Sequence, residues 1–174
     1  MTETDTVGRF VEQAKKFCQL IERRKFVSAS DFPTQCAQCL NDLYRAAPML
    51  SALPVEADTE ALIEDAVLDD QARKIRDEIG KKFGDHRFYW TVFNPYEVSS
   101  PIACDLGDDL ADIYRDIKDG LVAFNKGDAA EGLWHWQHSF RTHWGSHLVN
   151  ALRAIHYILS ARMFEEAYLD TSHA

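Results

Sequence analysis

The sequence lacks any long apolar run. Its uninterrupted apolar stretches fall well short of the roughly 20 residues that a membrane-spanning helix needs. The first residues, Met-Thr-Glu-Thr-Asp-Thr, also lack the basic and apolar regions of a secretory signal peptide. We therefore expect a cytoplasmic protein that does not bind membranes.

Positive charge is also scarce. Lysine and arginine total 19 against 28 aspartates and glutamates, which gives a formal net charge of −9. Proteins that bind nucleic acid or anionic membranes need a basic surface, so this composition disfavours both classes. The only basic run, Arg23-Arg24-Lys25, is short. A protein partner, whose identity the sequence leaves unknown, is expected to present a basic surface.

Cysteine is sparse, with four residues in the whole chain. Cys36 and Cys39 have the spacing of a redox motif, but they fall inside a helical pattern that no strand precedes, and no second pair completes a zinc site. We expect reduced thiols packed in the core. The sequence also lacks a glycine-rich phosphate loop and a serine in a nucleophile elbow.

What the chain does contain is helical periodicity. Hydrophobic residues make up 46% of 174 residues, which is enough for one sizeable core. No repeat or long linker divides the chain, so we expect a single helical domain over residues 1–174, with flexible tails at 1–5 and 169–174. The predicted fold is an all-α bundle of about five to seven helices. The expected helices cover residues 6–25, 33–50, 69–83, 105–125 and 129–167.

Two segments fit this pattern less well. Residues 55–68 are acidic and weakly periodic, so we expect a loop with a possible short helix. The segment His86–Tyr96 is aromatic, and because a strand there would lack a partner, we expect an extended loop packed on the helices. Its aromatic residues could close the open end of the bundle or line a ligand pocket. They are Phe88, Tyr89, Trp90, Phe93 and Tyr96.

Gly145 lies within the last expected helix and could break it. The apolar positions on either side nevertheless stay in one helical phase, from Leu133 through Trp144 to Ile158. We therefore expect this helix to be continuous or mildly kinked.

Three segments carry a resemblance to a known family. They are Tyr89-Trp-Thr-Val-Phe-Asn-Pro-Tyr96, Leu106-Gly-Asp-Asp-Leu-Ala-Asp-Ile-Tyr-Arg-Asp116, and His143-Trp-Gly-Ser-His147 followed by Ala151-Leu-Arg-Ala-Ile-His156. Over nearly its whole length the chain resembles a bacterial family catalogued as domain of unknown function 5063. The resemblance implies an all-α bacterial protein. Because the family has no assigned activity, it implies no catalytic residues.

A row of aspartates follows the helix expected from Asp105. At about 100° per residue, its apolar residues form a core-facing stripe and its aspartates form a second stripe beside it. These aspartates are Asp105, Asp109, Asp112, Asp116 and Asp119. Carboxylates at i,i+4 repel each other, so the fold should compensate them. The simplest interpretation is a solvated face with counterions.

Two histidines on the last expected helix offer a different compensation. His147 falls near the centre of the apolar stripe, and His143 lies one turn earlier at its margin. A buried imidazole without a partner costs about 1–3 kcal/mol, and the short turn at 125–128 makes the two helices antiparallel neighbours. We therefore expect Asp–His bridges between them. Three polar residues on the opposite face are expected in solvent: Glu131, His135 and His138.

Three interpretations of this cluster stay open. It is a structural polar network, a catalytic acid–base pair, or a divalent-metal site held by Asp109, Asp112, His143 and His147. The familiar Glu-x-x-His and His-Glu-x-x-His motifs are absent. The sequence favours a non-enzymatic interaction or regulatory module with an Asp–His network. The alternative is a small metal-dependent hydrolase in which metal-bound water is the nucleophile.

Overall fold

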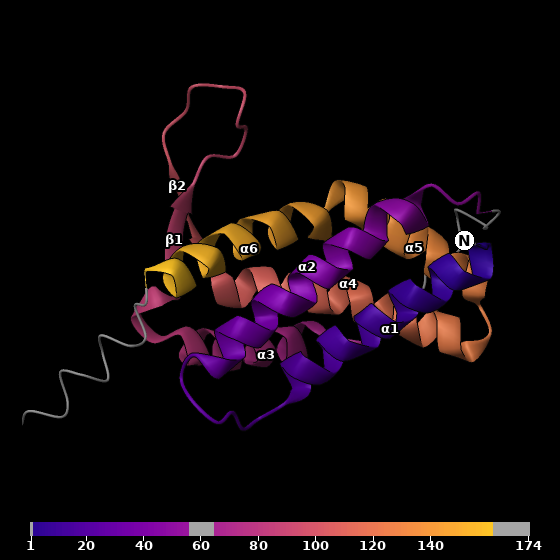
Figure 1. Ribbon diagram of the computed structural model, residues 1–174, viewed down its shortest axis with the longest axis horizontal. Coiled ribbons are helices and arrows are strands. Elements are labelled where there is room, and N and C mark those ends of the chain that lie inside the picture. Colours follow the sequence, from indigo (N-terminus) through magenta and orange to yellow (C-terminus); the bar gives the residue numbers. More distant parts are fainter. Residues whose placement is uncertain (1, 56–64, 162–174) are drawn as a thin grey trace, which may run out of the picture.

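The computed structural model describes residues 2–55 and 65–161, within which the chain forms six α-helices and one two-stranded sheet (Figure 1). The expected helical bundle is therefore confirmed. Most of the loop expected at 55–68, and the tail expected at 169–174, lie outside the described residues. The elements are α1 (Glu3–Glu22), α2 (Asp31–Ser51), α3 (Asp69–Phe83), a 3-10 turn η1 (Gly84–His86), β1 (Phe88–Thr91), β2 (Ile102–Asp105), α4 (Leu106–Lys126), α5 (Ala129–Thr142) and α6 (Trp144–Ser160).

α1 begins earlier than expected because its first turn is capped. The Thr2 hydroxyl accepts a hydrogen bond from the Asp5 N–H (3.1 Å), and the Thr2 N–H donates to the Asp5 carboxylate (3.0 Å). Such a capping box satisfies two backbone donors that would otherwise lack partners. Residues 3–5, expected in a tail, therefore form helix.

α4 is the central helix of the bundle. It packs against α1, α3, α5 and α6, while α1 and α2 pack on each other. Four residues of the apolar stripe expected on α4 are fully buried, Leu106, Leu110, Ile113 and Ile117, and the fifth, Phe124, is partly buried. No helix among the described residues has the length and hydrophobicity to cross a bilayer. Cys36 is likewise a free, buried thiol in the core.

α5 approaches α4 at very short range. A Cβ atom at Gly120 of α4 would collide with the indole of Trp136, so only glycine fits there. The Trp136 indole N–H donates to the Ile117 carbonyl at 3.1 Å, and its ring is fully buried. This contact anchors the polypeptide as it turns back along α4, with α6 continuing in the same direction (Figure 1).

The helix expected over 129–167 is not continuous. It breaks at His143, whose backbone (φ −144°, ψ −86°) leaves the helical region between α5 and α6. The expectation failed because the spacing of apolar residues indicates which face of a helix is buried. It does not indicate whether the backbone hydrogen bonds of the helix continue. Gly145 permits the tight packing at this junction, since a Cβ there would collide with the Phe140 carbonyl.

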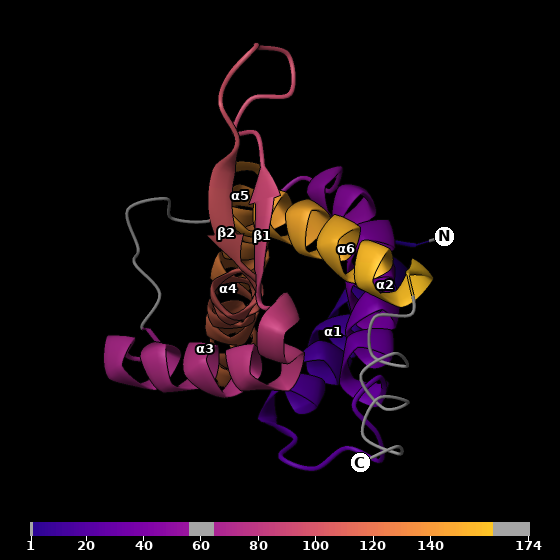
Figure 2. The ribbon, with the colours of Figure 1, turned by 90° about the vertical axis from the view of Figure 1, so that its left-hand side faces the viewer.

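Part of the aromatic segment after η1, Phe88–Thr91, is a strand and not the expected loop, whereas residues 92–96 form neither helix nor strand. β1 pairs antiparallel with β2, with Phe88 opposite Asp105 and Thr91 opposite Ile102. The loop between the two strands projects beyond the helices in both views (Figures 1 and 2), while the base of the hairpin contacts α4. Closure of the bundle is therefore not the role of most of its aromatics. Four of the five are largely exposed: Phe88, Trp90, Phe93 and Tyr96.

Candidate metal centre

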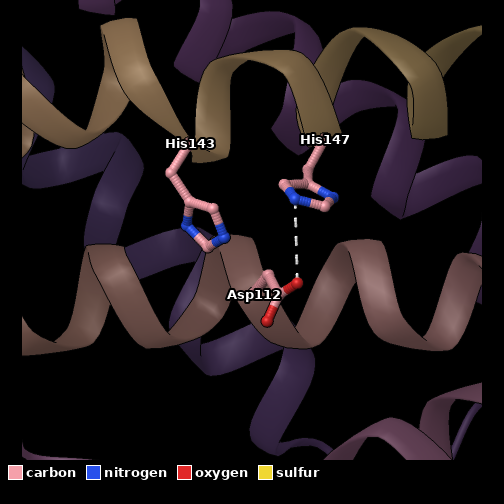
Figure 3. Close-up of side chains that lie close together, drawn as sticks. All are labelled: Asp112, His143 and His147. Carbon is pink, nitrogen blue, oxygen red and sulfur yellow. Dashed lines mark ion pairs between the residues drawn. The ribbon is translucent and has the colours of Figure 1, made fainter. Parts of the chain in front are cut away.

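Three aspartates of α4 face the start of α6. Asp109, Asp112 and Asp116 are spaced three and four residues apart, which places them on one side of α4 over two helical turns. Two imidazoles descend toward them, His143 from the helix junction and His147 from the first turn of α6 (Figure 3). The break at His143 thus lies directly beside the site.

His147 is held between two carboxylates. Its Nδ1 lies 2.8 Å from Asp109 Oδ1, and its Nε2 lies 3.7 Å from Asp112 Oδ2. Because a carboxylate only accepts hydrogen bonds, the proton resides on Nδ1, and in the neutral ring Nε2 presents a lone pair. The second oxygen of Asp109 accepts a hydrogen bond from the Tyr89 hydroxyl at 2.6 Å.

His143 is oriented in the same way by a different aspartate. Its Nδ1 lies 2.8 Å from Asp116 Oδ2, which again leaves Nε2 as the free nitrogen. The two imidazole rings meet edge to face with centroids 4.9 Å apart. Asp112 lies between the two bridged aspartates, and Figure 3 shows both rings directed toward it.

Hydrogen bonding and burial both shift the pKa values of side chains in the cluster. The hydrogen bond to Asp109 raises the pKa of His147, whereas burial raises the pKa of Asp112. Burial also raises the pKa of Tyr89, which therefore acts as a hydrogen-bond donor to Asp109 and not as an acid. Asp109 itself is 5% exposed and accepts hydrogen bonds on both oxygens.

The structure corrects the interpretation of the aspartate stripe as a solvated face. Asp109 and Asp119 are buried, and the side chain of Asp116 is only 14% exposed. It also corrects His135, which was expected in solvent. The His135 side chain is 20% exposed, and its Nε2 lies 3.1 Å from the backbone oxygen of Asp116. Burial lowers the pKa of His135.

Asp105 does not join the cluster. Its two oxygens receive Arg87 Nε at 2.8 Å and Arg87 Nη2 at 2.6 Å, and it caps α4 by accepting from the Gly107 N–H. This bidentate ion pair ties β1 to the start of α4. Asp105 therefore separates from the candidate cluster, and the side chains that come together form what we call the seam: Asp109, Asp112, Asp116, His143 and His147.

Within the seam, three side chains have the arrangement of a metal site. Asp112, His143 and His147 each offer one ligand atom, and these atoms all lie within 4.8 Å of one another. Ligand atoms about 2.0–2.1 Å from a tetrahedral zinc ion lie roughly 3.3 Å apart, so small rotations would bring this set into range. Asp109, expected as a fourth ligand, instead orients His147.

Comparisons with known proteins give a family and a structural relative. A family model described as "Domain of unknown function (DUF5063)" matches residues 2–161. The chain belongs to this family. A crystal structure of protein BF1032 from Bacteroides fragilis is similar to this member, with 29% identity, 88% of this chain and 91% of that chain covered, and a TM-score of 0.75. A search of curated proteins found none that matches this chain.

Three residues that shape the seam of this DUF5063 member were not singled out for it by the sequence. Arg87 pairs with Asp105, the Tyr89 hydroxyl donates to Asp109, and His135 hydrogen-bonds the backbone oxygen of Asp116 itself. The alternation of exposed and inward residues in β1 would have marked Tyr89, had the partner strand been recognised. His135 has no such signal, because its partner is a backbone carbonyl.

Proposed function

We propose that this protein binds one divalent transition-metal ion between α4 and α6, through Asp112 Oδ2, His143 Nε2 and His147 Nε2. The observation that carries the proposal is the pair of oriented imidazoles. Each Nδ1 is hydrogen-bonded to its own aspartate, so the Nε2 atoms of both rings are directed toward Asp112. Carboxylate-oriented histidines of this kind typically fix the tautomer and raise the basicity of metal ligands.

Two nitrogens and one carboxylate favour zinc over magnesium or calcium, which prefer all-oxygen sites. Three protein ligands also leave a fourth position for water, as in catalytic zinc sites. The side chains of His143 and Asp112 are 46% and 33% exposed, so solvent can reach that position. The arrangement supports a hydrolase-like role in which the ion lowers the pKa of its water.

Zinc binding to the purified protein tests this proposal. After treatment with a chelator, titration with Zn²⁺ against a competing indicator should show one site per chain. Asp112→Ala and His147→Ala should each weaken binding at least about 100-fold, because removal of one of three ligands leaves only two.

Asp108→Ala is the matched control. Asp108 lies on the same helix and carries the same charge, but its side chain is 55% exposed and reaches toward Arg76 instead of a histidine. It should leave zinc affinity within about threefold, since only a screened, longer-range charge is lost. Stoichiometric binding that survives Asp112→Ala and His147→Ala alike would overturn the proposal, as would the absence of a zinc site in the folded protein.

The interaction-module reading, with the seam as a structural network, is a second candidate. The observation that favours it is the hairpin, on which Phe88, Trp90, Phe93 and Tyr96 are largely exposed.

A further inference from the structure

The hairpin exposes apolar side chains where a soluble surface normally carries polar ones. Large residues along it are exposed by 66% at Phe88, 69% at Trp90, 90% at Phe93, 96% at Tyr96 and 109% at Val98. Several large exposed apolar side chains in one short segment mark an interaction site more often than an ordinary surface does. We call residues 88–104 the arm.

The arm is a two-stranded sheet supported on one face only, where the Tyr89 hydroxyl donates to Asp109 of α4. Each strand has four residues, and an isolated hairpin of two strands is at best marginally stable in water. Tyr89 and Thr91 are turned inward, but Phe88 and Trp90 on the opposite face of β1 are uncovered. A covering surface would stabilise this face of the sheet.

A cleft that such side chains could fill lies at the base of the arm. A cleft of about 500 Å³ separates β1 from α6, and its walls include Phe88, Trp90, Arg153 and Tyr157. Tyr157 is itself 65% exposed. Aromatic walls favour an aromatic occupant, because ring pairs gain energy beyond the area they bury.

Charge opposes contact with a second copy of this chain least at the arm. The chain carries a net charge of −9, so two copies repel each other over most of their surface. Glu97 is the single charged residue between positions 88 and 104. The arm is therefore the part of the surface where two copies can meet with the least repulsion.

The available area fits a dimer as well. Four exposed aromatic rings, at 150–250 Å² for each full burial, give on the order of 700 Å² per copy. A stable interface of standard size needs about 800 Å² from each partner. From these observations we propose that the arm is a dimerisation element. Phe93 and Tyr96, in the loop between β1 and β2, pack into the β1–α6 cleft of a second copy, and the same residues of the second copy pack into the cleft of the first. Such an exchange has the two-fold symmetry of most homodimers.

Analytical ultracentrifugation of the full chain tests this proposal. The unmodified protein should shift from monomer to dimer as its concentration rises to ~100 µM, a range in which interfaces of micromolar affinity form. A double variant, Phe93→Ser with Tyr96→Ser, should raise the dimer Kd at least about 100-fold, because central aromatics dominate such interfaces. Val27→Ser is the matched control, since Val27 is 97% exposed in the loop between α1 and α2.

A shortened arm gives an independent reading. Replacing residues 92–101 by an Asn-Gly turn joins Thr91 to Ile102, which are partners in the register, by a two-residue hairpin loop. This variant should be monomeric, with unchanged circular dichroism and unchanged zinc stoichiometry. A monomeric wild-type protein at the highest concentration would overturn the proposal. So would a dimer that keeps its Kd in the double variant or in the shortened arm.

Discussion

The seam and the arm depart from the usual pattern of burial in opposite directions. The seam brings carboxylates and imidazoles between helices, where Asp109 is 5% exposed. The arm leaves aromatic side chains in solvent, where Tyr96 is 96% exposed. In the seam, Asp109 and Asp116 are each paired with a histidine. On the outer face of the arm, Phe88 and Trp90 stay largely exposed, although the Arg87 guanidinium lies 5.2 Å from the Phe88 ring.

The difference separates two kinds of cost. A buried ionic network often contributes less stability than apolar packing of equal volume, yet breaking one partner is expensive. An exposed apolar surface has little effect on the folding free energy of one copy, but it can be buried favourably against another molecule. The seam should therefore respond to mutation through stability and metal affinity. The arm should respond through association.

Loss of Asp109 should have the largest effect on stability. Asp109→Ala removes the acceptor of both His147 Nδ1 and the Tyr89 hydroxyl, and it leaves two partly buried donors without a partner. In the presence of a chelator, we expect a loss of about 3 kcal/mol in the free energy of unfolding. Urea denaturation followed by circular dichroism measures it.

Asp108→Ala provides the contrast on the same helix. Its side chain is 55% exposed, so its removal should change the unfolding free energy by at most about 0.5 kcal/mol. Equal losses for the two variants would mean that Asp109 contributes only its charge to the dipole of α4, and that the seam is not a network.

The sequence was informative where structure is local. α3 was expected at 69–83 and is found there, because helix-forming residues and Gly84 mark its length and its end. The stripe of α4 follows from periodicity alone, and so does the neighbouring row of aspartates. The expected meeting of α4 aspartates with His147 rested on a short turn followed by one continuous or mildly kinked helix. The contact between Asp109 and His147 forms although the helix breaks at His143, because α5 and α6 both pack along α4.

Two features depended on contacts that the sequence does not display. The pairing of Phe88 with Asp105 spans a ten-residue loop, and β2 is too short to be distinguished from the start of α4. The break at His143 leaves the apolar phase intact, so it is invisible to periodicity. Both errors concern the backbone between elements, and both lie next to residues that shape the seam.

Asp119 sharpens the comparison, because it is buried on α4 without a histidine. It is 4% exposed and accepts a hydrogen bond from the Ala66 N–H at 2.8 Å. Burial raises its pKa from 3.8 to about 6, with Asp65 and Asp116 adding to the rise and Arg115 opposing it. The folded state thus holds the proton more tightly, so this contribution to stability is complete below pH 3.8 and is lost as pH rises through 6.

Asp119→Asn should therefore stabilise the protein only when the native carboxylate is ionised. Asparagine keeps an oxygen for the Ala66 N–H and removes the buried charge. We expect a gain of about 1–2 kcal/mol above neutral pH and none in acid, below the unfolded-state pKa. Urea denaturation across pH measures the difference between the two proteins. A gain of the same size at every pH would show that the Asp119 carboxyl does not titrate as described.

The smallest effect on stability should come from the arm. Phe93 is 90% exposed, so Phe93→Ser should change the unfolding free energy of a dilute, monomeric sample by less than about 0.5 kcal/mol. The same change at Phe10, which is 0% exposed and lies 4.9 Å from the Trp136 ring, should cost at least about 3 kcal/mol. Repeating the measurement at high concentration separates the two contributions, since a dimer adds stability that depends on concentration. If Phe93→Ser destabilised the dilute monomer as much as Phe10→Ser, the arm would be part of the core of one copy and not a surface for another.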